Sequence, residues 1–237
     1  MRKAAVLLTS LIPILVMADE QPLRVAVGGG FHPTMNSLSS RLSHELGMKV
    51  EITSVPIEST YQQLIKAQAP YDLVILANPE KMQNLAKQGS IYADSIVEVA
   101  RSQVVLWCPN PKVLMRVSLN DTLNEPTLTR LGLSPTNSPV GQLVAESIDL
   151  KPIQSKIKRA NHSLDAWRLA RSGKAECAFT MLGLMQPSDR YSIIPNRNIT
   201  LITGIPRSNR SPEKAQRVLQ FLNSPLIKAR IKNRGYS

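Results

Sequence analysis

Three consecutive glycines, Gly28, Gly29 and Gly30, are the first residues whose type and spacing suggest binding chemistry. They follow a strand-forming run at 23–27 and precede Pro33, which suits the first turn of a helix. A backbone without Cβ atoms can turn sharply and approach a ligand closely. Where a strand ends and a helix begins, free N–H groups and the helix dipole favour an anion. The stretch therefore predicts an anion-binding turn, with a tight strand-to-helix connection that holds no ligand as the alternative.

Two later stretches repeat this order of strand, turn and helix start. One follows a predicted strand at 49–55, and the other follows a short predicted strand at 131–134. Their polar and helix-starting residues are Glu58, Ser59 and Thr60 in the first, and Ser138, Pro139 and Val140 in the second. In open α/β sheets the turns after the strands form the ligand-binding crevice. We therefore expect both stretches to share one site with the glycine turn.

The charged and metal-binding side chains near these turns have more than one interpretation. Glu58 is either a pocket group that binds a cation or an amine, or a solvated carboxylate favoured by the helix dipole. His32 lies beside the glycine turn, and with Glu58 and Met181 it forms a His/Glu/Met set that would suit a transition metal. These residues are far apart in the sequence, so no metal site is predicted. His44 and His162 are expected to be structural.

Catalytic motifs are absent from the sequence. No serine lies in a nucleophile-elbow pattern, and there is no paired-carboxylate, phosphate-loop or metalloprotease motif. We therefore predict a binding protein without a cofactor rather than an enzyme.

Composition narrows the choice of partner. The net charge of +12 over 237 residues favours anionic solutes, acidic membrane surfaces or acidic proteins, with a solvated basic face as the alternative. Aromatic residues make up only 4% of the chain, which argues against stacking platforms for single-stranded nucleic acid. A nucleic-acid partner is not expected.

The amino terminus predicts export. Met1, Arg2 and Lys3 precede an apolar run at 4–16 and small residues up to Ala18, as in a secretory signal peptide over residues 1–18. The mature chain is then free in a periplasm, with a retained amino-terminal anchor as the alternative. In that oxidising compartment Cys108 and Cys177 form either one disulfide or two separately buried thiols, and the sequence leaves both open.

The elements that must position these turns alternate between strand and helix. The run at 72–77 is almost continuously apolar, as in a strand whose sheet is covered on both faces. Asn78 and Pro79 predict the next helix start, and Gly89 predicts its end. The same alternation continues through predicted strands at 104–108, 131–134 and 176–181. This order predicts an α/β protein with a parallel, doubly wound sheet.

The order of elements resembles the periplasmic molybdate-binding protein family of ABC transporters over roughly residues 22–237. The segments that carry the resemblance are Arg24–Val27 with the glycine turn, the Ala-Pro-x-Asp-Leu motif within Gln68–Ala77, Pro139–Gly141 and Ile231–Tyr236. The resemblance implies a two-lobed type II periplasmic binding protein fold, with a doubly wound sheet in each lobe and a hinge between them. Lobe 1 is expected at 19–102, lobe 2 at 103–200, and the return to lobe 1 at 201–237.

The resemblance also implies a function. Such a protein captures a small solute between its lobes, here expected to be an oxyanion, and delivers it as a monomer to an ABC permease. The family holds its anion with hydroxyl and N–H donors, but Gly30, Glu58 and Met181 stand at three hydroxyl positions. The alternative is a sensory or other non-transport module that binds a metal, an organic cation or a protein. The expected ligand-binding residues are Gly29, Gly30, Phe31, His32, Glu58, Ser59, Thr60, Ser138, Pro139, Val140 and Met181.

Overall fold

The computed structural model describes residues 21–114, 118–209 and 211–237. The predicted signal peptide lies outside these residues. The strands are β1 (Leu23–Gly28), β2 (Val50–Val55), β3 (Leu73–Leu76), β4 (Glu98–Trp107), β5 (Leu131–Leu133), β6 (Ile157–Arg159), β7 (Cys177–Met181) and β8 (Tyr191–Gly204). The helices are α1 (His32–Leu46), α2 (Ile57–Ile65), α3 (Pro79–Lys87), α4 (Leu119–Asn124), α5 (Pro139–Ser147), α6 (Ser163–Arg171), α7 (Pro212–Asn223) and α8 (Pro225–Lys232). No helix in these three ranges is both long enough and apolar enough to cross a membrane.

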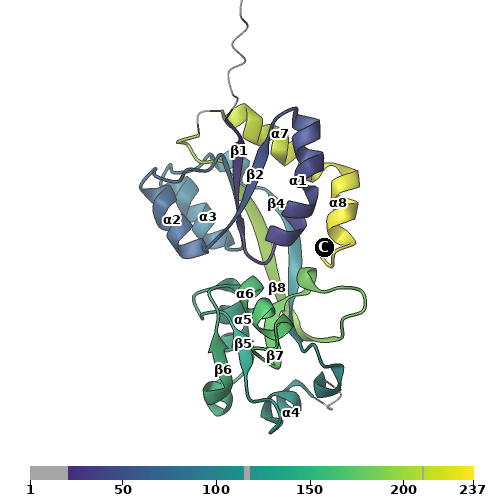
Figure 1. Cartoon of the computed structure of the whole chain (residues 1–237). Coiled ribbons are helices and arrows are strands. Elements are labelled where there is room, and N and C mark those ends of the chain that lie inside the picture. Colours follow the sequence, from purple (N-terminus) through teal and green to yellow (C-terminus); the bar gives the residue numbers. More distant parts are fainter. Residues whose placement is uncertain (1–20, 115–117, 210) are drawn as a thin grey trace, which may run out of the picture.

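The strands form two parallel groups that are joined by antiparallel strands. The hydrogen-bonded order is β2-β1-β3-β8-β4-β7-β5-β6, with parallel pairing in β2-β1-β3 and in β7-β5-β6. The first group carries α1, α2, α3, α7 and α8, and the second carries α4, α5 and α6 (Figure 1). We call these groups with their helices lobe 1 and lobe 2. The fold is the expected two-lobed type II periplasmic binding protein fold.

Two long strands, β4 and β8, run from one lobe to the other (Figure 1). Their pairing is irregular at the crossing, where Gln103 pairs with Asn198 but Val105 pairs with Ile193. Extra residues on one strand interrupt the ladder and bend it, which suits a hinge. The predicted boundaries after residues 102 and 200 fall within these strands, and the points of division stay a prediction.

The local signals for helix ends act as the sequence predicts. Asn78 Oδ1 accepts a hydrogen bond from the Lys81 N–H at 2.9 Å, so Asn78 is the N-cap of α3. Gly47 and Gly89 follow α1 and α3 with φ of 67° and 73°, a left-handed conformation that a Cβ would strain. These ends determine where each chain segment leaves its helix and enters the next strand.

Two long-range contacts brace the fold. Cys108 and Cys177 form a disulfide between the end of β4 and the start of β7, which decides between the two alternatives left open by the sequence. Near the carboxyl terminus, the buried Tyr236 hydroxyl donates to the Gly30 carbonyl at 2.9 Å, and its ring meets Phe31 edge-on at 5.1 Å. The chain end therefore supports the glycine turn from behind.

Candidate binding site

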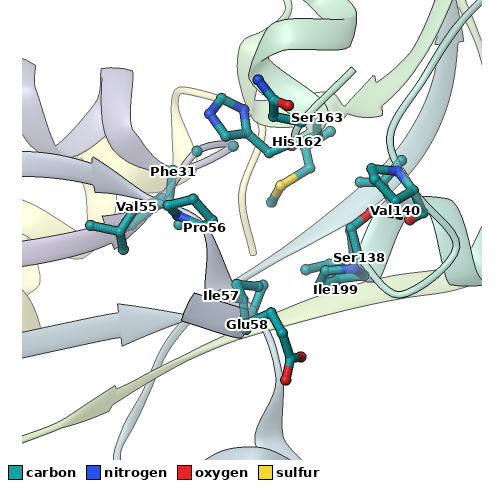
Figure 2. Close-up of a pocket in the computed structure, with 18 of the residues that line it drawn as sticks. Phe31, Val55, Pro56, Ile57, Glu58, Ser138, Val140, His162, Ser163 and Ile199 are labelled. Atoms are coloured by element: carbon teal, nitrogen blue, oxygen red, sulfur yellow. Dashed lines mark hydrogen bonds between the residues drawn. The ribbon is translucent and has the colours of Figure 1, made fainter. Parts of the chain in front are cut away.

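A cavity of about 310 Å³ lies between the lobes. The first residues of α2, α5 and α6 line it, and so does Phe31, the residue just before α1 (Figure 2). Its main lining residues are Gly29, Gly30, Phe31, Val55, Pro56, Ile57, Glu58, Asn137, Ser138, Pro139, Val140, Asn161, His162, Ser163, Met181, Ile199 and Leu201. Four helix amino termini direct positive dipole ends and N–H groups to one space.

The glycine turn has no room for Cβ atoms at Gly29 and Gly30, because side chains of lobe 2 pack against it. A Cβ at Gly29 would lie 2.6 Å from His162 Nδ1, and a Cβ at Gly30 would overlap Met181 Sδ. The same Cβ at Gly30 would lie 2.9 Å from Ser163 Oγ. The glycines therefore permit a close approach of lobe 2 side chains, and the predicted close approach of a ligand stays a prediction.

The start of α2 offers backbone donors rather than hydroxyls. Ser59 and Thr60 donate their hydroxyls to the Pro56 carbonyl at 3.3 and 2.8 Å, and neither residue lines the cavity. Helix α2 has no side-chain cap at Pro56, and the N–H groups of its first turn have no acceptor within the helix. Anion binding at this turn would therefore use the backbone.

Glu58 lines the rim of the cavity and has a counter-charge of its own. Its half-exposed carboxylate forms an ion pair with Lys81 on α3, and Figure 2 shows it directed away from His162 and Ser163. The hydrogen bond from Lys81 holds the pKa of Glu58 below its usual value, so the carboxylate is ionised at neutral pH. Glu58 is thus a lining residue whose carboxylate is solvated and paired, and its binding of a cation or an amine ligand stays a prediction.

Ser138, the predicted N-cap of α5, uses its hydroxyl for hydrogen bonds within its own turn. Ser138 Oγ accepts from the Gly141 N–H at 3.2 Å and lies 2.7 Å from the Pro135 carbonyl, to which it donates its proton. Pro139 has no N–H, so Val140 carries the first backbone donor of the helix. The retained serine therefore positions the helix, and the hydroxyl proton is not available to a ligand in this arrangement.

The start of α6 holds the pocket residues that the sequence analysis missed. His162, which was expected to be structural, is the N-cap of α6, with Nδ1 accepting from the Asp165 N–H at 3.2 Å, and it also lines the cavity. Burial holds the pKa of His162 below its usual value, Asp165 opposes this effect, and Arg168 adds to it. Among the hydrogen bonds of the described residues, none uses Ser163 Oγ, which makes this hydroxyl an available donor.

Most of the predicted site residues come together around the cavity, and three do not line it. Those that line it are Gly29, Gly30, Phe31, Glu58, Ser138, Pro139, Val140 and Met181. Those outside the lining are His32, Ser59 and Thr60. The described residues contain no group of three His, Cys, Asp or Glu side chains that could hold a metal, and His32 does not line the cavity with Glu58 and Met181.

The cavity between two α/β lobes, with helix starts from both, defines a type II periplasmic binding protein. The family model described as bacterial extracellular solute-binding protein matches residues 23–237, and the chain belongs to this family. As a member of this family it binds a small solute as the substrate-binding component of an ABC transporter.

Comparisons with individual proteins agree with this assignment. The chain is 24% identical to a molybdate-binding protein of Azotobacter vinelandii, over 92% of this chain and 91% of that protein. A solved structure of the periplasmic molybdate-binding protein of A. vinelandii matches with a TM-score of 0.82 at 23% identity, over 91% of this chain and 98% of that one. A periplasmic thiamin-binding protein matches with a TM-score of 0.68 at 14% identity, over 90% and 81%. These relatives are solute-binding proteins rather than enzymes, and at these identities the structures share the fold alone.

Proposed function

We propose that this chain is exported to the periplasm, loses residues 1–18, and as a monomer captures a small anion that it delivers to an ABC permease. The observation that carries the proposal is the convergence of four helix amino termini on one cavity whose lining, among the described residues, contains no lysine or arginine. Neutral N–H donors and helix dipoles can hold an anion, while the absence of a cationic side chain keeps release to the permease favourable. The relatives named as molybdate-binding proteins support an anionic ligand.

Closure would depend on the contacts between the lobes. His162 and Met181 of lobe 2 pack against Gly29 and Gly30 of lobe 1, so the structure corresponds to a closed arrangement. A ligand that contacts helix starts of both lobes binds this arrangement more tightly than an open one, and it shifts the population accordingly. The irregular pairing of β4 and β8 is where we place the hinge.

A thermal unfolding experiment on the mature chain, residues 19–237, tests the proposal. Small inorganic and organic anions would be compared at matched ionic strength with chloride and with organic cations. Binding to the folded state raises its stability by about 2.7 kcal/mol when the ligand is at 100 times its dissociation constant. A rise in the unfolding midpoint with at least one anion is expected, and no rise with any anion would refute anion capture.

Export is tested separately. Mass spectrometry of the chain isolated from a periplasmic fraction should find Asp19 as the first residue. Retention of residues 1–18 would favour the membrane-anchored alternative.

A further inference from the structure

The cavity is large for a bare oxyanion. It has a volume of about 310 Å³, and a water-sized group occupies about 30 Å³ in a liquid. The space therefore accommodates roughly ten non-hydrogen atoms, about twice the number in a tetrahedral oxyanion. Cavities that bind organic ligands begin at about this size.

We call the apolar part of the cavity lining, which contributes no side-chain donor, the apolar wall. Met181, Ile199 and Leu201 line it with thioether and hydrocarbon groups, and all three are buried in the protein. Val140 contributes a further apolar side chain beside its N–H. A tetrahedral oxyanion carries oxygens in every direction, so at least one oxygen would face this apolar wall. A buried oxygen without a donor weakens binding markedly, and more so when it is charged.

The donors that remain belong to the helix starts. Ser163 Oγ is available at the start of α6, whereas the Ser138 proton is used within its own turn. Backbone N–H groups in the first turns of α2, α5 and α6 add further donors, and Asn137, Asn161 and His162 line the cavity with side chains that carry N–H groups. One end of the cavity can thus hold a single anionic group while the rest of the cavity accepts an apolar body.

We propose that the ligand is a small organic acid, with one carboxylate at the helix starts and an apolar body of about six carbon atoms against Met181, Ile199 and Leu201. This inference rests on the proposed anion capture and specifies the class of the anion. Met181 is the specificity-determining residue. Its side chain lies against Gly30 in the cavity, at a position where the resemblance implies a hydroxyl donor to the ligand.

Isothermal titration calorimetry on the mature chain tests the proposal. The probes are hexanoate, 4-methylpentanoate and benzoate as organic acids, hexanamide as the uncharged analogue, and molybdate and sulfate as oxyanions. At least one organic acid should bind about tenfold or more tightly than hexanamide, molybdate and sulfate, a factor that corresponds to ~1.4 kcal/mol.

The Met181→Ser variant isolates the apolar wall. It removes the thioether and adds a hydroxyl, so the preference for the organic acid over molybdate should fall by about tenfold or more. Met185→Ser is the matched control, because Met185 is a nearby methionine that packs against another cluster and does not line the cavity. The preference of Met185→Ser for the organic acid over molybdate should equal that of the wild type. Circular dichroism would verify that both variants fold.

The outcomes separate the two proposals. If molybdate or sulfate binds as tightly as the best organic acid, the organic-acid inference is wrong and anion capture stands. If no anion binds at all, both are wrong. If hexanamide binds as tightly as hexanoate, the cavity is an apolar site, and the carboxylate assignment is overturned.

Discussion

Adding one methyl group at Gly30 should weaken ligand binding without destabilising the unliganded protein. In the closed structure the new Cβ would overlap Met181 Sδ and lie 2.9 Å from Ser163 Oγ. Both neighbours belong to lobe 2, so the clash exists only when the lobes are closed. Overpacking of this kind costs about 1–3 kcal/mol, and the Gly30→Ala variant should therefore bind about 5- to 150-fold more weakly.

A double-mutant cycle provides the assay. Dissociation constants for hexanoate and molybdate would be measured by calorimetry for Gly30→Ala, Met181→Ala and the double variant. Because Met181→Ala removes Sδ, the double variant should regain most of the affinity lost by Gly30→Ala, with a coupling of about 1 kcal/mol or more. Gly28→Ala shows the effect of a methyl group in the same cavity-lining turn without a clash against lobe 2, since its Cβ would approach no atom closer than the Ile75 carbonyl at 3.7 Å. If Gly30→Ala binds like the wild type, or if the two changes are additive, the bound state does not contain this contact.

Three further predictions concern stability. The disulfide between Cys108 and Cys177 closes a sequence separation of 69 residues. Replacing both cysteines with serine should therefore reduce the free energy of unfolding by about 4 kcal/mol. Urea unfolding would measure this reduction, and an unchanged midpoint would contradict it. Tyr236→Phe leaves the Gly30 carbonyl without its 2.9 Å donor and should cost about 1–3 kcal/mol in the same assay, whereas a neutral effect would mean that water replaces the hydroxyl. Burial lowers the pKa of His162, so the unfolded state binds the proton more readily than the folded state. The contribution of His162 to the free energy of unfolding should therefore be complete above a pH of about 6.5 and should fall as the pH drops through the lowered pKa. His162→Asn keeps an N-cap residue and should reduce this pH dependence, as thermal unfolding between neutral and acidic pH would reveal.

Three of the four helix starts were predictable as parts of the site because each follows an apolar strand and carries glycine, proline or serine. The fourth, at Ser163, is predictable as a helix start from its capping residue, but its place at the cavity is not. Strand β6 (Ile157–Arg159) has only three residues, two of them exposed and basic, so no apolar run preceded Asn161, His162 and Ser163. The only available signal was the position of His162 and Ser163 just before an amphipathic helix, which is the pattern of the other three starts.

Other features depend on contacts that spacing cannot specify. Ser59 and Thr60 stood at the predicted turn, yet their hydroxyls donate to the Pro56 carbonyl, a local competition that is common for these side chains. The pairing of Cys108 with Cys177 required the register of β4 with β7, in which Trp107 lies opposite Ala178. The strand and helix order followed from local patterns, but side-chain directions at the site were determined by tertiary packing.

If the ligand is the proposed anion, Glu58 disfavours a second negative charge on it. Its carboxylate replaces a donor of the family that the sequence resembles, and Lys81 on α3 neutralises it from outside the cavity. Within residues 21–114, 118–209 and 211–237, no lysine or arginine lines the cavity, so no cationic side chain of these ranges compensates a second ligand charge there. Each unit of ligand charge meets the same residual repulsion from the carboxylate, and a dianion therefore experiences it twice. Shape and the donors of the helix starts must supply the affinity, and both suit a ligand with a single anionic end and an apolar body.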